Sequence, residues 1–339
     1  MYFSKKYKYI SFVFLIHETS LNYKKNKMSY YLFPKANSCN IQIQNTKNDS
    51  IIISPSLNRY LNELNSQILS IRIEYEYLQN EMHPYYKGIL ANGPDESYYE
   101  ITEIMYTMRI NAYLDFYVAK NIQILNLGSN SNAILHSRKH LGRNDINNCD
   151  LSIFQFSNLF HKMHIIFADY MSDIRNMLIR LCTILVYQAK NGVLIWKIGD
   201  CFTPLMLDII YFISSFYHKI YFIKPTIMDV SKSEKYLVCK GFCPYEINYI
   251  EKIMSLYHTI ANFKEPIYRI LLNSIPFFFL NKLEEINTIM GQVQLEQIHT
   301  ILLLVGNKFK QEKIQYMSKM NTQKCMEWMN KHKVTYLHM

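Results

Sequence analysis

Glycine and proline are scarce in this sequence, at nine residues each among 339. Long polar tracts are lacking too, and only 19% of the residues are charged whereas 49% are hydrophobic. A disordered chain has the opposite balance, because it cannot bury enough apolar surface to offset the loss of conformational entropy. The composition therefore predicts a folded protein with a sizeable core.

CxxC pairs are absent, although the chain has seven cysteines. They are Cys39, Cys149, Cys182, Cys201, Cys239, Cys243 and Cys325. This thin spacing argues against a zinc knuckle and against a disulfide framework. It fits a reducing, cytosolic compartment best.

The sequence also lacks an uninterrupted apolar run long enough for a membrane span. The longest run, residues 205–223, is broken by Asp208, His218 and Lys219, whereas a spanning helix needs about 20 apolar residues. We therefore expect no transmembrane helix and no membrane partner.

Residues 1–27 imitate a signal peptide, with lysines ahead of a short apolar run. Glu18, Thr19 and Ser20 then make a poor cleavage site, so secretion is disfavoured. If Met28 is the working start, residues 1–27 are an accessory basic extension outside the folded core.

Acidic residues are outnumbered, 27 against 37 basic ones, which gives a formal charge of +10. An excess of this size points to an anionic partner. RNA, with one phosphate per nucleotide, is one such partner.

Hydrophobic periodicity divides the chain into regions. Apolar residues recur every three or four positions over residues 57–78, which predicts an amphipathic helix. A second helix is expected to open at Ser97, with Glu100 as the other member of a capping box, and to end near residue 119. Residues 28–120 are therefore expected to be mostly helical.

Residues 121–243 alternate between strand and helix patterns. Short apolar runs predict strands at residues 122–127, 164–169, 193–198, 220–223 and 236–240. Helices are expected over 173–190 and from Thr203, an N-cap followed by Pro204, to about residue 217. This order is typical of a doubly wound α/β sheet, whose ligands lie beyond the carboxyl ends of the strands. Residues 244–339 are expected to be helical with a basic tail.

Three polar residues fall at or just beyond the ends of predicted strands: Asp169, Lys197 and Glu234. An ammonium between two carboxylates in a partly buried cleft can act as a general base or orient a hydroxyl nucleophile. From spacing alone, a lysine that simply reaches solvent from a strand end is an equally good interpretation.

Residues 192–242 contain an ordered set of further fixed points. Lys197 lies in a hydrophobic strand, Lys224-Pro225 forms a turn, and Ser233-Glu234-Lys235-Tyr236 opens the next strand. This segment resembles the carboxyl half of the FtsJ-like 2′-O-ribose RNA methyltransferases, especially the mRNA cap-methylating forms of large cytoplasmic DNA viruses.

The resemblance implies a Rossmann-like methyltransferase sheet, S-adenosyl-L-methionine as cofactor and capped or 5′-terminal RNA as substrate. It implies that Lys197 deprotonates a ribose 2′-hydroxyl, while Asp169 and Glu234 flank the lysine and tune its pKa. The cofactor would contact Gly128, Ser129, Asn130 and Asp169. Methyl transfer from a sulfonium needs no metal, and the nearby histidines, His161 and His164, lack a complement of other ligands, so no metal site is expected.

Upstream, the chain departs from the family pattern. The family's lysine in a Tyr-Lys-x-x-Glu-Ile setting corresponds to Glu100, which we interpret as the capping-box residue. Only one glycine remains where the family has Pro-Gly-Gly. The interval between residues 127 and 164 is short, so we expect a sheet reduced in its first half. The acid that would hold the adenosine ribose stays open between Asp145 and Asp150.

Two functions remain open. The first is an RNA 2′-O-methyltransferase that acts in the host cytoplasm or in virions, favoured by Asp169, Lys197 and Glu234. The second is a degenerate relative that has kept the sheet and an RNA-binding surface and serves as a subunit of a capping complex. Glu100, the glycine-poor loop and the short middle segment favour the second.

Overall fold

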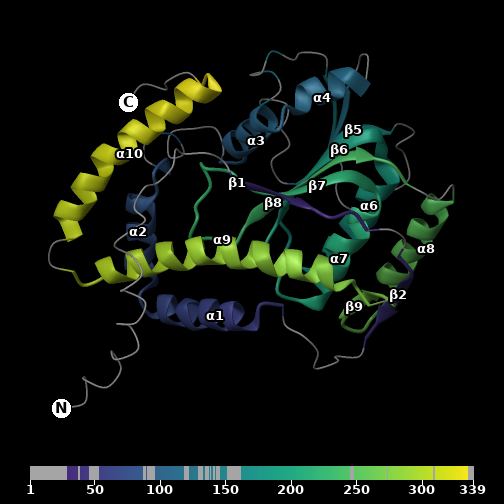
Figure 1. Ribbon diagram of the computed structural model, residues 1–339, viewed down its shortest axis with the longest axis horizontal. Coiled ribbons are helices and arrows are strands. Elements are labelled where there is room, and N and C mark those ends of the chain that lie inside the picture. The colour runs from purple at the N-terminus through teal and green to yellow at the C-terminus, as the bar shows by residue number, and fades with distance from the viewer. Residues whose placement is uncertain are drawn as a thin grey trace.

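The computed structural model describes residues 29–36, 39–45, 53–86, 89, 96–117, 122–128, 133, 137, 139, 142, 146–150, 162–244, 248–272, 274–307 and 310–334. A seven-stranded sheet with helices on both faces forms the centre of the molecule (Figure 1). The elements in chain order are β1 (Ser29–Phe33), β2 (Ile41–Gln44), α1 (Pro55–Ser70), α2 (Arg72–Met82), α3 (Glu96–Thr107), α4 (Ile110–Tyr117), β3 (Ile122–Leu127), β4 (Ile146–Asp150), β5 (Met163–Ala168), α6 (Ile174–Tyr187), β6 (Gln188–Ile198), α7 (Pro204–Ser214), β7 (Tyr217–Lys224), β8 (Lys235–Phe242), α8 (Tyr249–Asn262), β9 (Arg269–Leu271), α9 (Phe277–Leu304) and α10 (Lys310–His332).

The sheet has the strand order β1-β7-β8-β6-β5-β3-β4. Strands β4, β3, β5 and β6 pair in parallel, whereas β8 is antiparallel to both β6 and β7. The chain passes from β3 to β4 at the sheet edge and then returns to β5 on the other side of β3. This reversal creates a topological switch point between β3 and β5, where ligands of α/β sheets bind. The predicted fold class, an α/β protein with a Rossmann-like methyltransferase sheet, is confirmed.

The strand and helix order predicted from residue 164 onward is also confirmed, as β5, α6, β6, α7, β7 and β8. The helix expected over 173–190 ends at Tyr187, because Gln188 adopts an extended backbone and starts β6. Helix α7 stops at Ser214, short of the predicted end, and Tyr217 already belongs to β7. Four short strands, β1, β2, β4 and β9, were not predicted from the sequence.

The short middle segment still contributes a strand. Residues 146–150 form β4, which runs parallel to β3 at the edge of the sheet. In the described part of the segment between β3 and β5, β4 is the one strand present.

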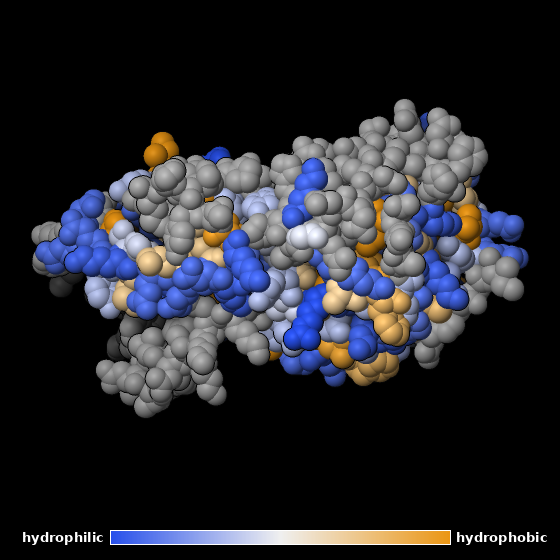
Figure 2. All heavy atoms as spheres, turned by 90° about the horizontal axis from the view of Figure 1, so that it is seen from above, coloured by the Kyte–Doolittle hydropathy of each residue, from blue (hydrophilic) through white to orange (hydrophobic). Residues whose placement is uncertain are grey.

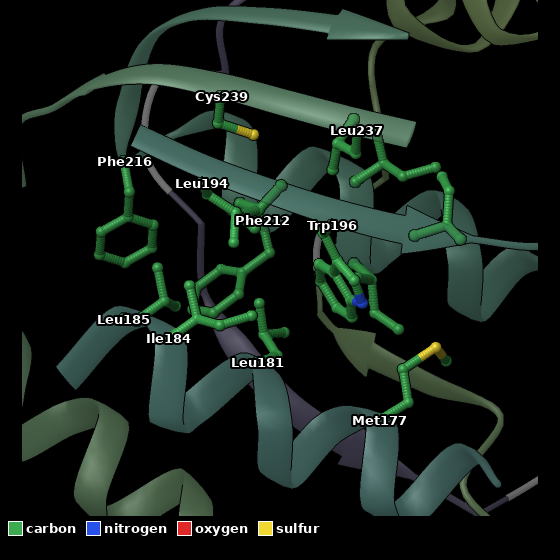
Figure 3. Packing of buried hydrophobic residues seen from close by; sticks show 14 of the residues in the cluster. Met177, Leu181, Ile184, Leu185, Leu194, Trp196, Phe212, Phe216, Leu237 and Cys239 are labelled. Atoms are coloured by element: carbon green, nitrogen blue, oxygen red, sulfur yellow. The ribbon is translucent and has the colours of Figure 1, made fainter. Parts of the chain in front are cut away.

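Alternate residues of each strand project to opposite faces of the sheet. On one face, Leu194 and Trp196 of β6 point toward α6, from which Met177, Leu181 and Ile184 project back at them (Figure 3). Trp196 is only 1% exposed. The alternate residues of β6, Ile195 and Lys197, must face the other side of the sheet, which α3 and α4 cover.

Two predicted helices differ in detail. The helix expected over 57–78 is divided into α1 and α2 at Ile71, where the backbone leaves helical geometry with φ −127°. Helix α3 begins at Glu96, so Ser97 lies inside the helix and is buried. The interpretation of Ser97 and Glu100 as a capping box is therefore wrong.

The long apolar run contains one charge that the fold neutralises. Asp208 of α7 is fully buried, and its carboxylate binds the Arg269 guanidinium at 2.7 and 2.8 Å. It also accepts hydrogen bonds from the Ile270 and Leu271 amides, which ties α7 to the small sheet of β2 and β9.

Among the described residues, no helix combines the length and apolar character needed to cross a membrane.

The N-cap of α7 gives a first test of the fold. The Thr203 hydroxyl accepts a hydrogen bond of 3.3 Å from the Met206 amide, as the sequence predicts. We expect Thr203→Ala to lower the free energy of unfolding by about 1 kcal/mol, because this amide loses its partner. Urea denaturation should show this loss, while Thr203→Ser should remain close to the original protein; equal stability of the alanine variant would contradict the cap.

Candidate functional site

The predicted site residues meet along one edge of the sheet. Three residues, one on each of β3, β5 and β6, are register partners from strand to strand. The residues that directly follow these partners are Gly128, Asp169 and Lys197, in that order. They therefore form a row across three neighbouring strands, and Tyr236 of β8 extends the row as the direct partner of Lys197. The row lies beside the switch point.

Lys197 is the centre of a buried polar cluster. Its ammonium donates a hydrogen bond of 3.0 Å to Glu100 Oε2, and Glu234 Oε2 lies 3.8 Å away. The Tyr236 hydroxyl donates a hydrogen bond of 2.6 Å to the same oxygen of Glu100. Only 11% of the Lys197 side chain is exposed. Water therefore screens the two ion pairs weakly.

The protonation of Lys197 reflects two opposing effects. Burial disfavours the ammonium, but the carboxylate of Glu100, followed by those of Glu234 and Asp169, outweighs burial and raises the pKa of Lys197. The side chain is therefore charged at neutral pH. A general base must release this proton before it can act.

Asp169 is fixed mainly through its backbone. Its amide donates to the Leu127 carbonyl at 3.3 Å, and the Arg180 guanidinium donates to its carbonyl oxygen. The Asp169 Oδ1 atom accepts a hydrogen bond of 2.8 Å from the Tyr170 amide. These contacts hold Asp169 between Gly128 and Lys197 in the row.

Glu100 is the functional candidate that the sequence analysis assigned to the wrong role. The resemblance to the FtsJ-like family implies a lysine at this position, and this was the sequence signal that could have placed Glu100 in the site. The S-x-x-E pattern is local, whereas the contact of Glu100 with Lys197 joins residues 97 positions apart.

A second glutamate anchors the helix that carries Glu100. Glu103 is fully buried and accepts hydrogen bonds from the amides of Thr226 and Ile227, from the Thr226 hydroxyl and from Trp328 Nε1. The carboxylate thus ties α3 to the connection between β7 and β8 and to α10. This anchoring fixes the depth of Glu100 in the site.

The switch point has features of a ligand-binding edge. A Cβ atom at Gly128 would lie 2.7 Å from Asp169 Cβ, so only glycine fits there without a shift. Asn126 of β3 is 2% exposed, and neither atom of its side-chain amide has a hydrogen-bond partner. Asn126 was missed by the sequence analysis. Its buried, unpaired amide offers both a donor and an acceptor to a ligand.

Not every candidate can be placed. Ser129, Asn130 and Asp145 lie outside the described residues. Asp150 ends β4, and its register partner is Asn126 of β3, so its backbone reaches the same edge as the row.

Metal ligands do not gather in the described part of the chain, which contains no cluster of three or more His, Cys, Asp or Glu residues suited to an ion. His161 lies outside the described residues. His164 Nδ1 accepts a hydrogen bond of 3.0 Å from the Gln123 amide.

Comparison with known proteins gives one distant similarity. No family model matches the chain. Over 121 residues, or 35% of its length, the chain is 24% identical to the cap-specific mRNA (nucleoside-2′-O-)-methyltransferase 1 of Dictyostelium discoideum. The match spans only 16% of that protein. The chain is thus distantly similar to part of a methyltransferase.

Proposed function

We propose that this chain transfers a methyl group from S-adenosyl-L-methionine to a ribose 2′-hydroxyl of RNA, with Lys197 as the general base. The observation that carries this proposal is the row of Gly128, Asp169 and Lys197 beside the switch point, with the Glu234 carboxylate 3.8 Å from the lysine. The resemblance to FtsJ-like enzymes and the distant relative, whose name specifies cap 2′-O-methylation, support the same chemistry.

The switch-point edge fits the cofactor. Gly128 keeps the backbone free of a side chain, and Asn126 holds an unpaired donor and acceptor there. The backbone of β4 reaches the same edge at Asp150, and we propose Asp150 as the acid that holds the cofactor ribose, with Ser129 and Asn130, outside the described residues, as further cofactor-binding positions. When bound, S-adenosyl-L-methionine supplies an activated methyl group on a sulfonium.

Lys197 would accept the proton of the ribose 2′-hydroxyl that receives the methyl group. In its neutral form, Lys197 Nζ would take the proton of the 2′-hydroxyl as this oxygen accepts the methyl group, and the sulfonium that gives up the methyl group would leave as a neutral thioether. The resulting ammonium is then stabilised by Glu100 and Glu234, which already lie 3.0 and 3.8 Å away. Holding the reactants in line supplies much of the remaining rate enhancement.

RNA as the substrate agrees with the charge of the chain. The formal charge is +10, and α10 contributes five lysines, Lys310, Lys313, Lys319, Lys324 and Lys331, against two glutamates. In Figure 2 the described residues at the left of the molecule, where α10 lies, are mostly hydrophilic. Phosphate binding by such a surface is favoured by the release of counterions. Capped mRNA in a viral capping system, in host cytoplasm or in virions, is the setting that we propose.

Cofactor binding is the direct test. We expect calorimetric titration with S-adenosyl-L-methionine to show binding well below millimolar concentration. Asn126→Ala should weaken that affinity by about fivefold, because one hydrogen bond to the ligand is lost. Asn62→Ala, at an exposed position of α1, is the control and should bind as the original chain does. Absence of binding at millimolar cofactor would contradict the enzyme proposal.

One observation favours a second function. Glu100 occupies the position of a family lysine and keeps Lys197 protonated, which opposes its use as a base. A chain of this kind could instead serve as an RNA-binding subunit of a capping complex. Retention of capped RNA together with no detectable cofactor binding would support this second function, whereas a Lys197-dependent methylated product would overturn it.

A further inference from the structure

A small acidic cleft lies beside Lys197. Its lining includes Asn80 of α2, His83, Glu96, Glu100, Asp229 and Glu234. Glu100 and Glu234 also contact the Lys197 ammonium, so the cleft and the proposed reaction centre share two walls. The cleft has a volume of about 30 Å³. Because one water needs about 10–15 Å³, this space admits the edge of a planar group and not a whole nucleotide.

The charge of the cleft defines the ligand chemistry. Four carboxylates and one ammonium, that of Lys232, line it, although the chain as a whole is basic. A phosphate would be repelled there. Asp229 is already engaged, because it accepts hydrogen bonds from Gln79 and Ser231. The exposed carboxylate of Glu96 is the one best placed to receive N–H donors from a ligand.

His83 adds a donor. The side chain is 7% exposed, and its Nδ1 atom accepts a hydrogen bond of 3.2 Å from the Tyr85 amide. Nδ1 therefore carries no proton, and the proton of the neutral ring belongs on Nε2, which has no partner. Burial, together with Lys232, lowers the pKa of His83 against the opposing effects of Asp229 and Glu100, and so favours this neutral ring.

A cleft that offers both carboxylate acceptors and a buried N–H donor selects against simple cations. A guanidinium or an ammonium has donors only and would leave His83 Nε2 unsatisfied. A nucleobase edge presents donors and acceptors side by side. Guanine alone combines two adjacent N–H donors for a carboxylate with a carbonyl oxygen for the histidine.

We propose that this cleft binds the N–H edge of the base whose own ribose places its 2′-hydroxyl at Lys197, and that it prefers guanine. Glu96 accepts from N1–H and the N2 amino group, and His83 Nε2 donates to O6. The inference rests on the proposed RNA methyltransferase function and assigns it a preference for the first nucleotide after the cap.

The test compares capped RNA oligonucleotides that differ only in the first nucleotide, which is guanosine, inosine, adenosine, cytidine or uridine. Fluorescence anisotropy should show about fivefold tighter binding of the guanosine RNA than of the adenosine, cytidine and uridine RNAs, a preference at the low end for a bidentate base contact. The inosine RNA, which lacks only the N2 amino group, should bind with intermediate affinity. Glu96→Gln and His83→Asn should each reduce this preference to less than about twofold and leave the affinity for the adenosine RNA unchanged. Glu251→Gln, on the exposed surface of α8, removes the same charge and should keep the preference.

The possible outcomes separate the two proposals. Equal affinity for all five RNAs, alongside normal cofactor binding, would overturn the base preference and leave the methyltransferase function standing. A preference that survives both Glu96→Gln and His83→Asn would place base recognition elsewhere and overturn the inference as well. Displacement of the RNA by millimolar guanidinium without any base preference would assign the cleft to an arginine of a protein partner, again against the inference.

Discussion

Lys197→Ala is expected to reduce methyl transfer to capped RNA by about a thousandfold, within the range that general base catalysis contributes. The change removes the only ammonium that contacts both Glu100 and Glu234 within the described residues. Without it, the 2′-hydroxyl loses the general base that we propose for it. The measurement is single-turnover transfer of a radiolabelled methyl group with saturating cofactor.

The alanine change also leaves Glu100 buried beside the Tyr236 hydroxyl without its cationic partner, which destabilises the fold. Lys197→Gln keeps a donor and most of the volume, so it tests the chemistry in a chain that retains the cluster. Affinity for S-adenosyl-L-methionine should be unchanged in both variants, and Lys219→Ala, an exposed lysine of β7, should retain full activity. Loss of less than about tenfold in the glutamine variant would rule out Lys197 as the base.

Much of the fold could be predicted because its signals are local. The strand at 122–127, the alternation from β5 to β8 and the Thr203 cap all follow from short patterns of apolar and capping residues. Strand β4 escaped prediction because INNCD has only two apolar residues, and an edge strand needs fewer of them. Strand β1 lies far from its partner β7 in sequence, and no local pattern reports that pairing.

Candidate site residues could be predicted from the sequence only where their position at the end of a predicted strand identified them. Asp169 and Lys197 could be placed together because they lie at the carboxyl ends of parallel strands, which meet at one edge. Glu234 reaches the same edge because it precedes β8, which is antiparallel to β6. Glu100 was misassigned because its partner, Lys197 of β6, is 97 positions away in the sequence, and no local pattern reports such a contact. Asn126 was overlooked because an asparagine inside a strand becomes informative only when its amide is known to be buried and unpaired.

The choice between the two proposed functions depends on the negative charge of Glu100. Glu100 is buried, and its carboxylate contacts Lys197 at 3.0 Å and Tyr236 at 2.6 Å. The same contact that orders the lysine raises its pKa, so the neutral amine is a minor species at physiological pH. An enzyme with this arrangement is restrained at neutral pH and becomes faster in alkaline solution.

Glu100→Gln should therefore increase the rate of methyl transfer at pH 7.5 by more than about tenfold. The glutamine oxygen can still accept hydrogen bonds from Lys197 and Tyr236, while the negative charge that favours the ammonium is gone. The direction of the pH dependence follows from the raised pKa of Lys197. In the original chain the rate should rise with pH up to the raised pKa of Lys197, and the variant should complete the same rise at lower pH.

The control for this change is Glu251→Gln, which removes the same charge at an exposed position of α8 and should leave the midpoint of the pH profile where it is. The profile separates a change of pKa from general damage, since a damaged site would lose rate at every pH. If Glu100→Gln lowers the rate throughout, Glu100 is itself required for the reaction. If neither the original chain nor the variant transfers methyl groups at any pH, while both bind capped RNA, the buried ion pair belongs to an RNA-binding subunit in which Lys197 serves the fold and not the chemistry.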